Sequence, residues 1–207
     1  MTATPSTPRS SPRAGCIPRF TRRSGGRFLA LSCMLLFALA RATAQEAFME
    51  YQIKAACLFN FLKFVEFPED AFADPLAPIV IGVVGDDPFG SSLPQVVVGK
   101  TVQGRDLVIR LYHPGENLRS AHILFISGSE RKRIPMILSE LHGSSVLTVA
   151  DTAGFVDEGG MIQFLNENDR IRFAINLDAT TRARLKLSSK LLSLAKVVGG
   201  NGKEAGS

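Results

Sequence analysis

The run Ile79-Val80-Ile81-Gly82-Val83-Val84 is the clearest indication of the fold in this sequence. It is short, apolar and rich in β-branched residues, which is typical of a strand buried on both faces. The next residues, Gly85-Asp86-Asp87-Pro88-Phe89-Gly90, form a turn that leads into a helical pattern. Asp86 or Asp87 can cap that helix, and Pro88 suits its first position. A buried strand that turns directly into a helix is the unit from which parallel sheets are built.

The same alternation of strands and helices extends in both directions from this stretch. The patterns predict a helix over 46–66 that Pro68 ends, strands at 107–112, 123–127 and 146–149, a helix from Ser129 to Leu141 closed by Gly143, a hairpin of 161–165 with 171–175, and a last helix over 179–197 capped by Asp178. We therefore expect an α/β fold with a mainly parallel sheet flanked by helices, followed by a C-terminal β-hairpin and helix.

The basic charge of the chain is concentrated in its first 44 residues. The formal net charge is +5, but seven arginines and no acidic residue lie in 1–44, which leaves 17 basic and 19 acidic residues in the remainder. The remainder is therefore slightly acidic and gives no general electrostatic reason to bind nucleic acid.

The first 44 residues have the three parts of a secretory signal. An Arg-rich region ends near Arg27, an apolar run spans 28–40, and Ala42-Thr43-Ala44 offers the small residues that a signal peptidase accepts. The run is shorter than the roughly 20 residues of a membrane anchor, and the residues before Cys33 make a poor lipoprotein motif. We expect cleavage near Ala44, although translation from a later start would fit the long basic region. The expected organisation is a signal peptide at 1–44, a domain at 45–198 and a disordered tail at 199–207.

Export leaves one cysteine in the mature chain. Cys16 and Cys33 belong to the leader, and Cys57 cannot form an intramolecular disulfide alone. Because Cys57 lies in an apolar helical pattern, we expect a buried, inert thiol and a domain held by its core. An intermolecular bridge is the alternative.

Two loops are candidates for a small-ligand site, because ligands bind beyond the carboxyl ends of strands in open parallel sheets. The candidate residues are Asp86, Asp87 and Gly90 after the first strand, and Asp151, Gly159 and Gly160 after the strand at 146–149. Neither loop has a dinucleotide or phosphate-loop motif, and turn formation and helix capping explain the first one equally well.

No motif for catalysis or metal binding is present. The three histidines, His113, His122 and His142, have no partner at metal-ligand spacing. Ser129 follows a strand but lacks the Gly-x-Ser-x-Gly pattern, and a helix cap is its simpler role. We expect a protein that is not an enzyme and carries no cofactor or metal.

Several stretches, taken in order, resemble the YfiR family of exported bacterial proteins. They are Glu50–Ala56 with Phe59-Asn60-Phe61 and Lys63–Pro68, Gly85–Gly90 with Gly99-Lys100 and Gly104-Arg105, His122–Ser127 with Ser129-Glu130, Val146–Val149 with Asp151, Gly154-Phe155 and Gly159–Ile162, and Ile171–Phe173 with Ile175–Leu177 and Leu187–Leu192. Together they extend over about residues 48–198, so the resemblance covers nearly all of the mature domain.

The resemblance implies a Rossmann-like α/β domain that remains in the periplasm. It implies a repressor that binds the periplasmic sensor region of an inner-membrane diguanylate cyclase and restrains cyclic di-GMP synthesis, and that meets the membrane only through this partner. Relatives carry cysteine pairs that confer redox sensitivity, and this chain departs from them because only Cys57 remains.

A repressor of this kind needs an exposed apolar patch on which to dock. The candidates are Phe155, Met161, Ile162 and Phe164 around the second loop and the hairpin, and Phe89 after the first strand. Core packing is the competing role for these side chains. We also expect monomer–dimer behaviour. A periplasmic ligand-binding sensor without a cyclase partner is the alternative function, and an unrecognised hydrolase using Asp151 and Glu158 is a third.

Overall fold

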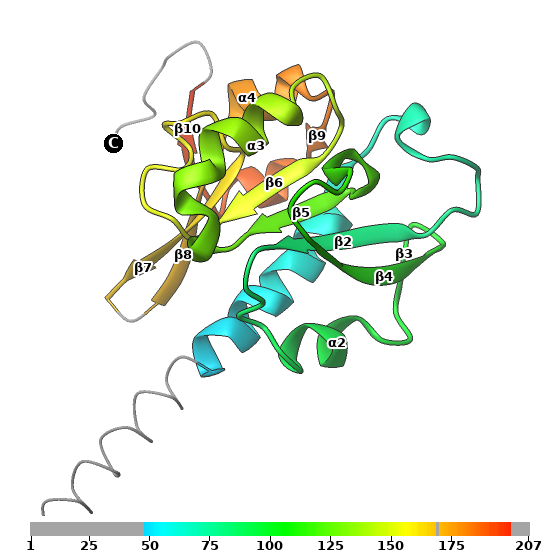
Figure 1. Cartoon of the computed structure of the whole chain (residues 1–207), viewed down its shortest axis with the longest axis horizontal. Coiled ribbons are helices and arrows are strands. Elements are labelled where there is room, and N and C mark those ends of the chain that lie inside the picture. The colour runs from blue at the N-terminus through cyan, green and yellow to red at the C-terminus, as the bar shows by residue number, and fades with distance from the viewer. Residues whose placement is uncertain (1–47, 169, 200–207) are drawn as a thin grey trace, which may run out of the picture. The chain divides into compact units, whose positions relative to one another are not determined.

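The computed structural model describes residues 48–168 and 170–199, which all belong to one compact unit (Figure 1). The predicted signal peptide and its cleavage near Ala44, and the predicted tail beyond Gly199, lie outside the described residues. Within the described part, no helix is both long and apolar enough to cross a bilayer.

The described chain forms a mixed eight-stranded sheet with helices. The sheet order is β10-β8-β7-β6-β5-β2-β4-β3. Its strands are β2 (Ile79–Val84), β3 (Thr101–Val102), β4 (Arg105–Tyr112), β5 (Ile123–Ile126), β6 (Leu147–Ala150), β7 (Ile162–Glu167), β8 (Arg170–Asn176) and β10 (Lys196–Val198). The strands from β4 through β2, β5 and β6 to β7 are parallel neighbours, whereas β3 pairs with β4, and β8 with β7, in antiparallel fashion. The α/β class is confirmed.

The continuous apolar runs are strands covered on both faces. Successive side chains of a strand point to opposite faces, and in β5 Ile123 and Phe125 enter one core cluster while Leu124 and Ile126 enter the other. The N-terminal helix, residues 48–64, covers the first face, and α3 (Ile134–Glu140) covers the second (Figure 1).

The remaining elements are short. They are β1 (Val65–Glu66), which pairs with β9 (Lys186–Leu187), the 3-10 helices η1 (Glu69–Ala71), η2 (Leu118–Ser120) and η3 (Gly128–Arg133), and the α-helices α2 (Ser92–Val97), α4 (Leu177–Arg182) and α5 (Ser189–Leu192). The predicted hairpin is confirmed as β7 and β8, with Leu165 opposite Arg172. Gly143 has the left-handed conformation expected after α3, with a φ of 75°.

The predicted last helix over 179–197 is wrong. The chain folds there as α4, β9, α5 and β10. Arg184 has a left-handed φ of 59°, which ends the helical path, and the following residues pair with β1. Lys196–Val198 then pairs in parallel with Ala174–Asn176 of β8. Asn176, not Asp178, caps α4 by accepting a hydrogen bond from the backbone N–H of Ala179 at 2.9 Å.

The predicted caps of two other helices are also wrong. The helix after β2 begins at Ser92, not at Pro88, and Asp87 instead closes a turn by accepting the Phe89 N–H at 2.8 Å. The helix predicted from Ser129 starts as η3, whose N-cap has no side-chain hydrogen bond. The Ser129 hydroxyl instead accepts the Asp86 N–H at 2.9 Å, which ties the loop after β2 to the loop after β5.

Candidate functional site

The most distinctive polar feature is a buried lysine on the N-terminal helix. The helix brings Lys54 to the carboxyl end of β6, where Asp151 directly follows the strand. The Lys54 ammonium lies 2.7 Å from Asp151 Oδ2 and 2.6 Å from Glu50 Oε1, and Lys54 is only 3% exposed. Lysine is seldom buried so completely unless it is paired, so the two carboxylates account for its position.

Tyr51 completes this arrangement, which we call the ion-pair clamp: Glu50, Tyr51, Lys54 and Asp151. The Tyr51 hydroxyl donates to Asp151 Oδ2 at 2.8 Å, and the Lys54 ammonium lies 4.3 Å from the centre of the Tyr51 ring. Burial, the hydrogen bond to Asp151 and the nearby carboxylates raise the pKa of Tyr51 well above its usual value. Tyr51 therefore remains a neutral donor.

The ion-pair clamp is suited to hold the helix, not to do chemistry. The Asp151 carboxylate is shared between two donors, and the Lys54 ammonium is shared between two carboxylates. Within the described residues, no group of three or more His, Cys, Asp or Glu side chains could hold a metal ion. The clamp fixes the first turns of the helix against the sheet, because it joins Lys54 to Asp151, which lies 97 residues away in the sequence.

Those first turns carry exposed apolar side chains. Phe48 is 42% exposed, Met49 is 56% exposed and Ile53 is 50% exposed. At 100° per residue these three side chains fall within one arc of the helix together with the exposed Gln52. We call Phe48, Met49 and Ile53 the apolar helix face. Ile53 lies on this exposed side of the helix, whereas its neighbour Lys54 is buried.

The predicted partner-binding residues do not form an exposed patch. All five are buried: Phe89, Phe155, Met161, Ile162 and Phe164. β7 lies inside the sheet between β6 and β8, so its apolar side chains are covered. We therefore correct the prediction that a partner docks on these residues: they have the alternative role, which is packing in the core.

The predicted ligand loops are not brought together into one site. Asp86, Asp87 and Gly90 are exposed turn residues, and Asp151 belongs to the ion-pair clamp. Gly160 is buried against the Phe155 ring, which leaves no room for a Cβ. Gly159 alone among the six candidates lines a described pocket.

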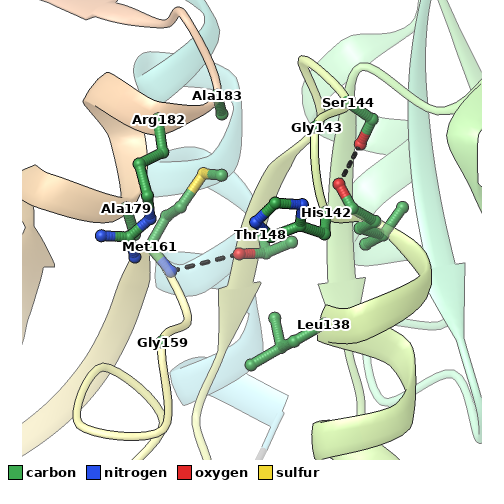
Figure 2. Close-up of a pocket in the computed structure, with 11 residues that line it drawn as sticks. Leu138, His142, Gly143, Ser144, Thr148, Gly159, Met161, Ala179, Arg182 and Ala183 are labelled. Atoms are coloured by element: carbon green, nitrogen blue, oxygen red, sulfur yellow. Dashed lines mark hydrogen bonds between the residues drawn. The ribbon is translucent and has the colours of Figure 1, made fainter.

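That pocket lies between α3, β6, the start of β7 and α4, and encloses about 230 Å³ (Figure 2). It is lined mainly by aliphatic side chains, with Arg182 contributed by α4 and His142 by the turn after α3. Figure 2 shows the Thr148 hydroxyl accepting the Met161 N–H, a bond of 3.1 Å.

The histidines and Cys57 have structural surroundings. His122 is buried, its Nδ1 accepts the Val80 N–H at 3.0 Å, and its ring stacks on Phe72 at 4.6 Å. Burial lowers the pKa of His122, which keeps the imidazole neutral. Cys57 is a half-buried free thiol whose pKa is raised by burial, which agrees with the predicted low reactivity.

The sequence pattern indicated Asp151 but not its pairing with Lys54 and Tyr51. Glu50 and Lys54 are spaced i,i+4 in the order that stabilises a helix, and a lysine amid apolar helical positions is an available signal. The pairing with Asp151 depends on tertiary structure and had no local signal.

Fold and site together define a mixed α/β domain whose buried charges are paired and whose N-terminal helix presents an apolar face. A family model described as YfiR/HmsC-like matches residues 51–196, and the chain belongs to that family. Among solved structures, a conserved domain protein from Vibrio cholerae O1 biovar El Tor strain N16961 aligns at 11% identity with a TM-score of 0.42. The alignment covers 57% of this chain and 54% of that chain, so it spans about half the length of each. No curated protein matches the chain.

Proposed function

We propose that this protein is an exported periplasmic regulator that binds the periplasmic sensor region of an inner-membrane diguanylate cyclase and inhibits the enzyme. The observation that carries the proposal is membership of the YfiR/HmsC-like family over residues 51–196. The signal-like composition of residues 1–44 supports export, because a cleaved leader would place the domain beside the sensor region.

The apolar helix face is the docking surface that we assign to this partner. Amphipathic helices commonly dock through apolar side chains spaced three or four residues apart, and Met49 and Ile53 have that spacing with about half of each side chain exposed. The ion-pair clamp holds the helix before binding, which lowers the entropic cost of docking.

A regulatory role without catalysis is part of this proposal. It is supported by the paired state of the Asp151 carboxylate and by the hydrogen bond that commits the Ser129 hydroxyl to the Asp86 N–H. The hydrolase alternative needs Asp151 as an acid or base, and its two donors at 2.7 and 2.8 Å disfavour that use.

A Rossmann-like arrangement, which the resemblance implies, is part of this proposal and is supported by the sheet order. The parallel strands run in the order β4-β2-β5-β6-β7, and the chain reverses direction across the sheet between β2 and β5. This is the order of flavodoxin-like doubly wound sheets.

A monomer–dimer equilibrium also remains part of the proposal and is measured by light scattering of the purified protein.

Deletion and complementation test the function in cells. Removing the gene is expected to raise cellular cyclic di-GMP, and returning the wild-type gene is expected to lower cyclic di-GMP to its original level. A Met49→Asp/Ile53→Asp variant is expected to reach the periplasm at normal levels and fail to restore repression. Met136→Asp is the matched control, because Met136 is a comparably exposed apolar residue on α3.

Two results would contradict the proposal. Unchanged cyclic di-GMP after deletion would argue against a cyclase partner and favour the alternative of a ligand sensor that acts without one. Full repression by the Met49→Asp/Ile53→Asp variant would keep the partner but remove the apolar helix face as its docking surface.

A further inference from the structure

The pocket between α3, β6 and α4 has an apolar interior (Figure 2). Its walls include Leu138 and Leu141 from the α3 side, Met161 directly before β7, and Ala179 and Ala183 from the α4 side. The small side chains of Ala179 in α4 and of Ala183 directly after it leave the space open, because larger side chains at these positions would fill it. The pocket shares no lining residue with the ion-pair clamp or the apolar helix face.

The charged side chain that lines this pocket, Arg182, is basic. Arg182 and His142 are both exposed, and none of the eleven lining residues is acidic. Within the described residues, neither side chain takes part in an ion pair or a side-chain hydrogen bond. The nearby arginines differ in this respect. Arg119 donates to the carbonyls of Glu140 and His142, and Arg184 pairs with Asp70 at 2.8 Å. Among the described residues, the guanidinium of Arg182 is therefore unpaired beside this apolar pocket.

Thr148 adds a polar group to the lining. Its side chain is buried, and its oxygen accepts the Met161 N–H at 3.1 Å. A hydroxyl that accepts one hydrogen bond still has its own proton to donate. The pocket therefore combines an apolar interior with hydrogen-bond donors, which is the usual composition of a small-molecule site.

From these features we propose that the pocket binds a small carboxylate with a short apolar body. The guanidinium fork of Arg182 matches a carboxylate in shape and charge, and the aliphatic walls would cover the body of the ligand. The volume of about 230 Å³ lies below the roughly 300–1,000 Å³ of drug-sized sites, so the ligand has few heavy atoms. This proposal does not depend on the cyclase partner, because it concerns a separate part of the molecule.

Calorimetric titration of the purified protein with three six-carbon compounds tests the proposal. Hexanoate, 1-hexanol and hexylamine share an apolar body and differ in the charge of the head group. Hexanoate is expected to bind at least about tenfold more tightly than 1-hexanol, which a charge-assisted hydrogen bond supplies, and hexylamine is expected to bind more weakly still. Arg182→Gln is expected to remove most of the preference for hexanoate.

Two further variants make the test specific. Arg184→Gln removes an exposed arginine that does not line the pocket, and it is expected to bind hexanoate like the wild type. Ala183→Leu fills the pocket and is expected to abolish binding of hexanoate and 1-hexanol alike, with retained folding checked by circular dichroism. Should Ala183→Leu misfold, the exposed Arg182→Gln variant still decides the question.

Three outcomes would overturn the proposal. They are the absence of saturable hexanoate binding at millimolar concentration, equal affinity for hexanoate and 1-hexanol, and an equal loss of affinity in Arg182→Gln and Arg184→Gln. All are measured on the isolated protein, so they leave the proposed regulation of a cyclase untouched.

Discussion

Replacement of Lys54 by methionine is expected to destabilise the fold through the carboxylates that it leaves behind. The change keeps an apolar side chain of similar length but removes the ammonium that lies 2.7 Å from Asp151 and 2.6 Å from Glu50. Breaking a buried ion pair on one side costs about 3–5 kcal/mol. Since the side chain of Glu50 is 34% exposed, we expect a loss near the lower end, about 3 kcal/mol.

A double-mutant cycle separates the ion pair from simple packing. Asp151→Asn removes the charge but retains an oxygen that can accept from Tyr51. In the Lys54→Met background, this second change removes an unpaired charge. The loss of stability in the double variant should therefore be smaller than the sum of the two single losses by at least about 1 kcal/mol. Lys63→Met is the matched control, because Lys63 is an exposed lysine on the same helix, and it should change stability by less than about 0.5 kcal/mol.

Urea unfolding followed by far-UV circular dichroism at pH 7 measures these free energies. A constant m-value would show that the variants change stability and not the compactness of the unfolded chain. The reasoning would be refuted if Lys54→Met cost no more than Lys63→Met, or if the two changes in the cycle were simply additive.

Two further predictions concern the core and the pH dependence of stability. Gly160→Ala is expected to cost about 1–3 kcal/mol of unfolding free energy, because a Cβ at this position would overlap the Phe155 ring. Gly128→Ala is the control, because a Cβ there meets open space. Equal urea midpoints for the two variants would contradict this prediction. Because the pKa of His122 is lowered in the folded protein, the unfolded chain binds a proton at this residue at a higher pH than the folded protein does. The free energy of unfolding should therefore fall as the pH drops below about 6.5. His122→Asn, whose oxygen can accept the Val80 N–H, should make thermal midpoints at pH 5 and pH 7 more alike, and an unchanged pH dependence would exclude His122 as its source.

The central strands could be predicted because their signal is local. β2 and β5 are continuous apolar runs, and β6 is interrupted only by Thr148. Such runs need cover on both faces whatever their neighbours are. The hairpin of β7 and β8 also had a local signal, in the turn composition between two alternating segments.

The C-terminal segment could not be predicted because non-local pairing overrides helix propensity there. The leucines of residues 185–194 have helical spacing, yet Leu187 pairs with Val65 and Lys196 pairs with Ala174. No pattern within the segment contains this information.

The candidate site was predictable only in part. Asp151 could be singled out because it follows a buried strand, but its pairing with Lys54 depends on how the N-terminal helix crosses the sheet. The partner-binding candidates failed because an apolar side chain near a loop has the same appearance in the sequence whether it is exposed or buried, as Phe155 and Phe164 illustrate.

The most direct test of the central claim is capture of the partner. The protein, with an affinity tag after Ser207, is recovered from solubilised membranes of its own host, and the bound proteins are identified by mass spectrometry. The account predicts that a diguanylate cyclase with a periplasmic sensor region is the dominant bound protein, and that the Met49→Asp/Ile53→Asp variant loses it while Met136→Asp retains it. Recovery of no membrane-bound diguanylate cyclase by the wild-type protein would contradict the account.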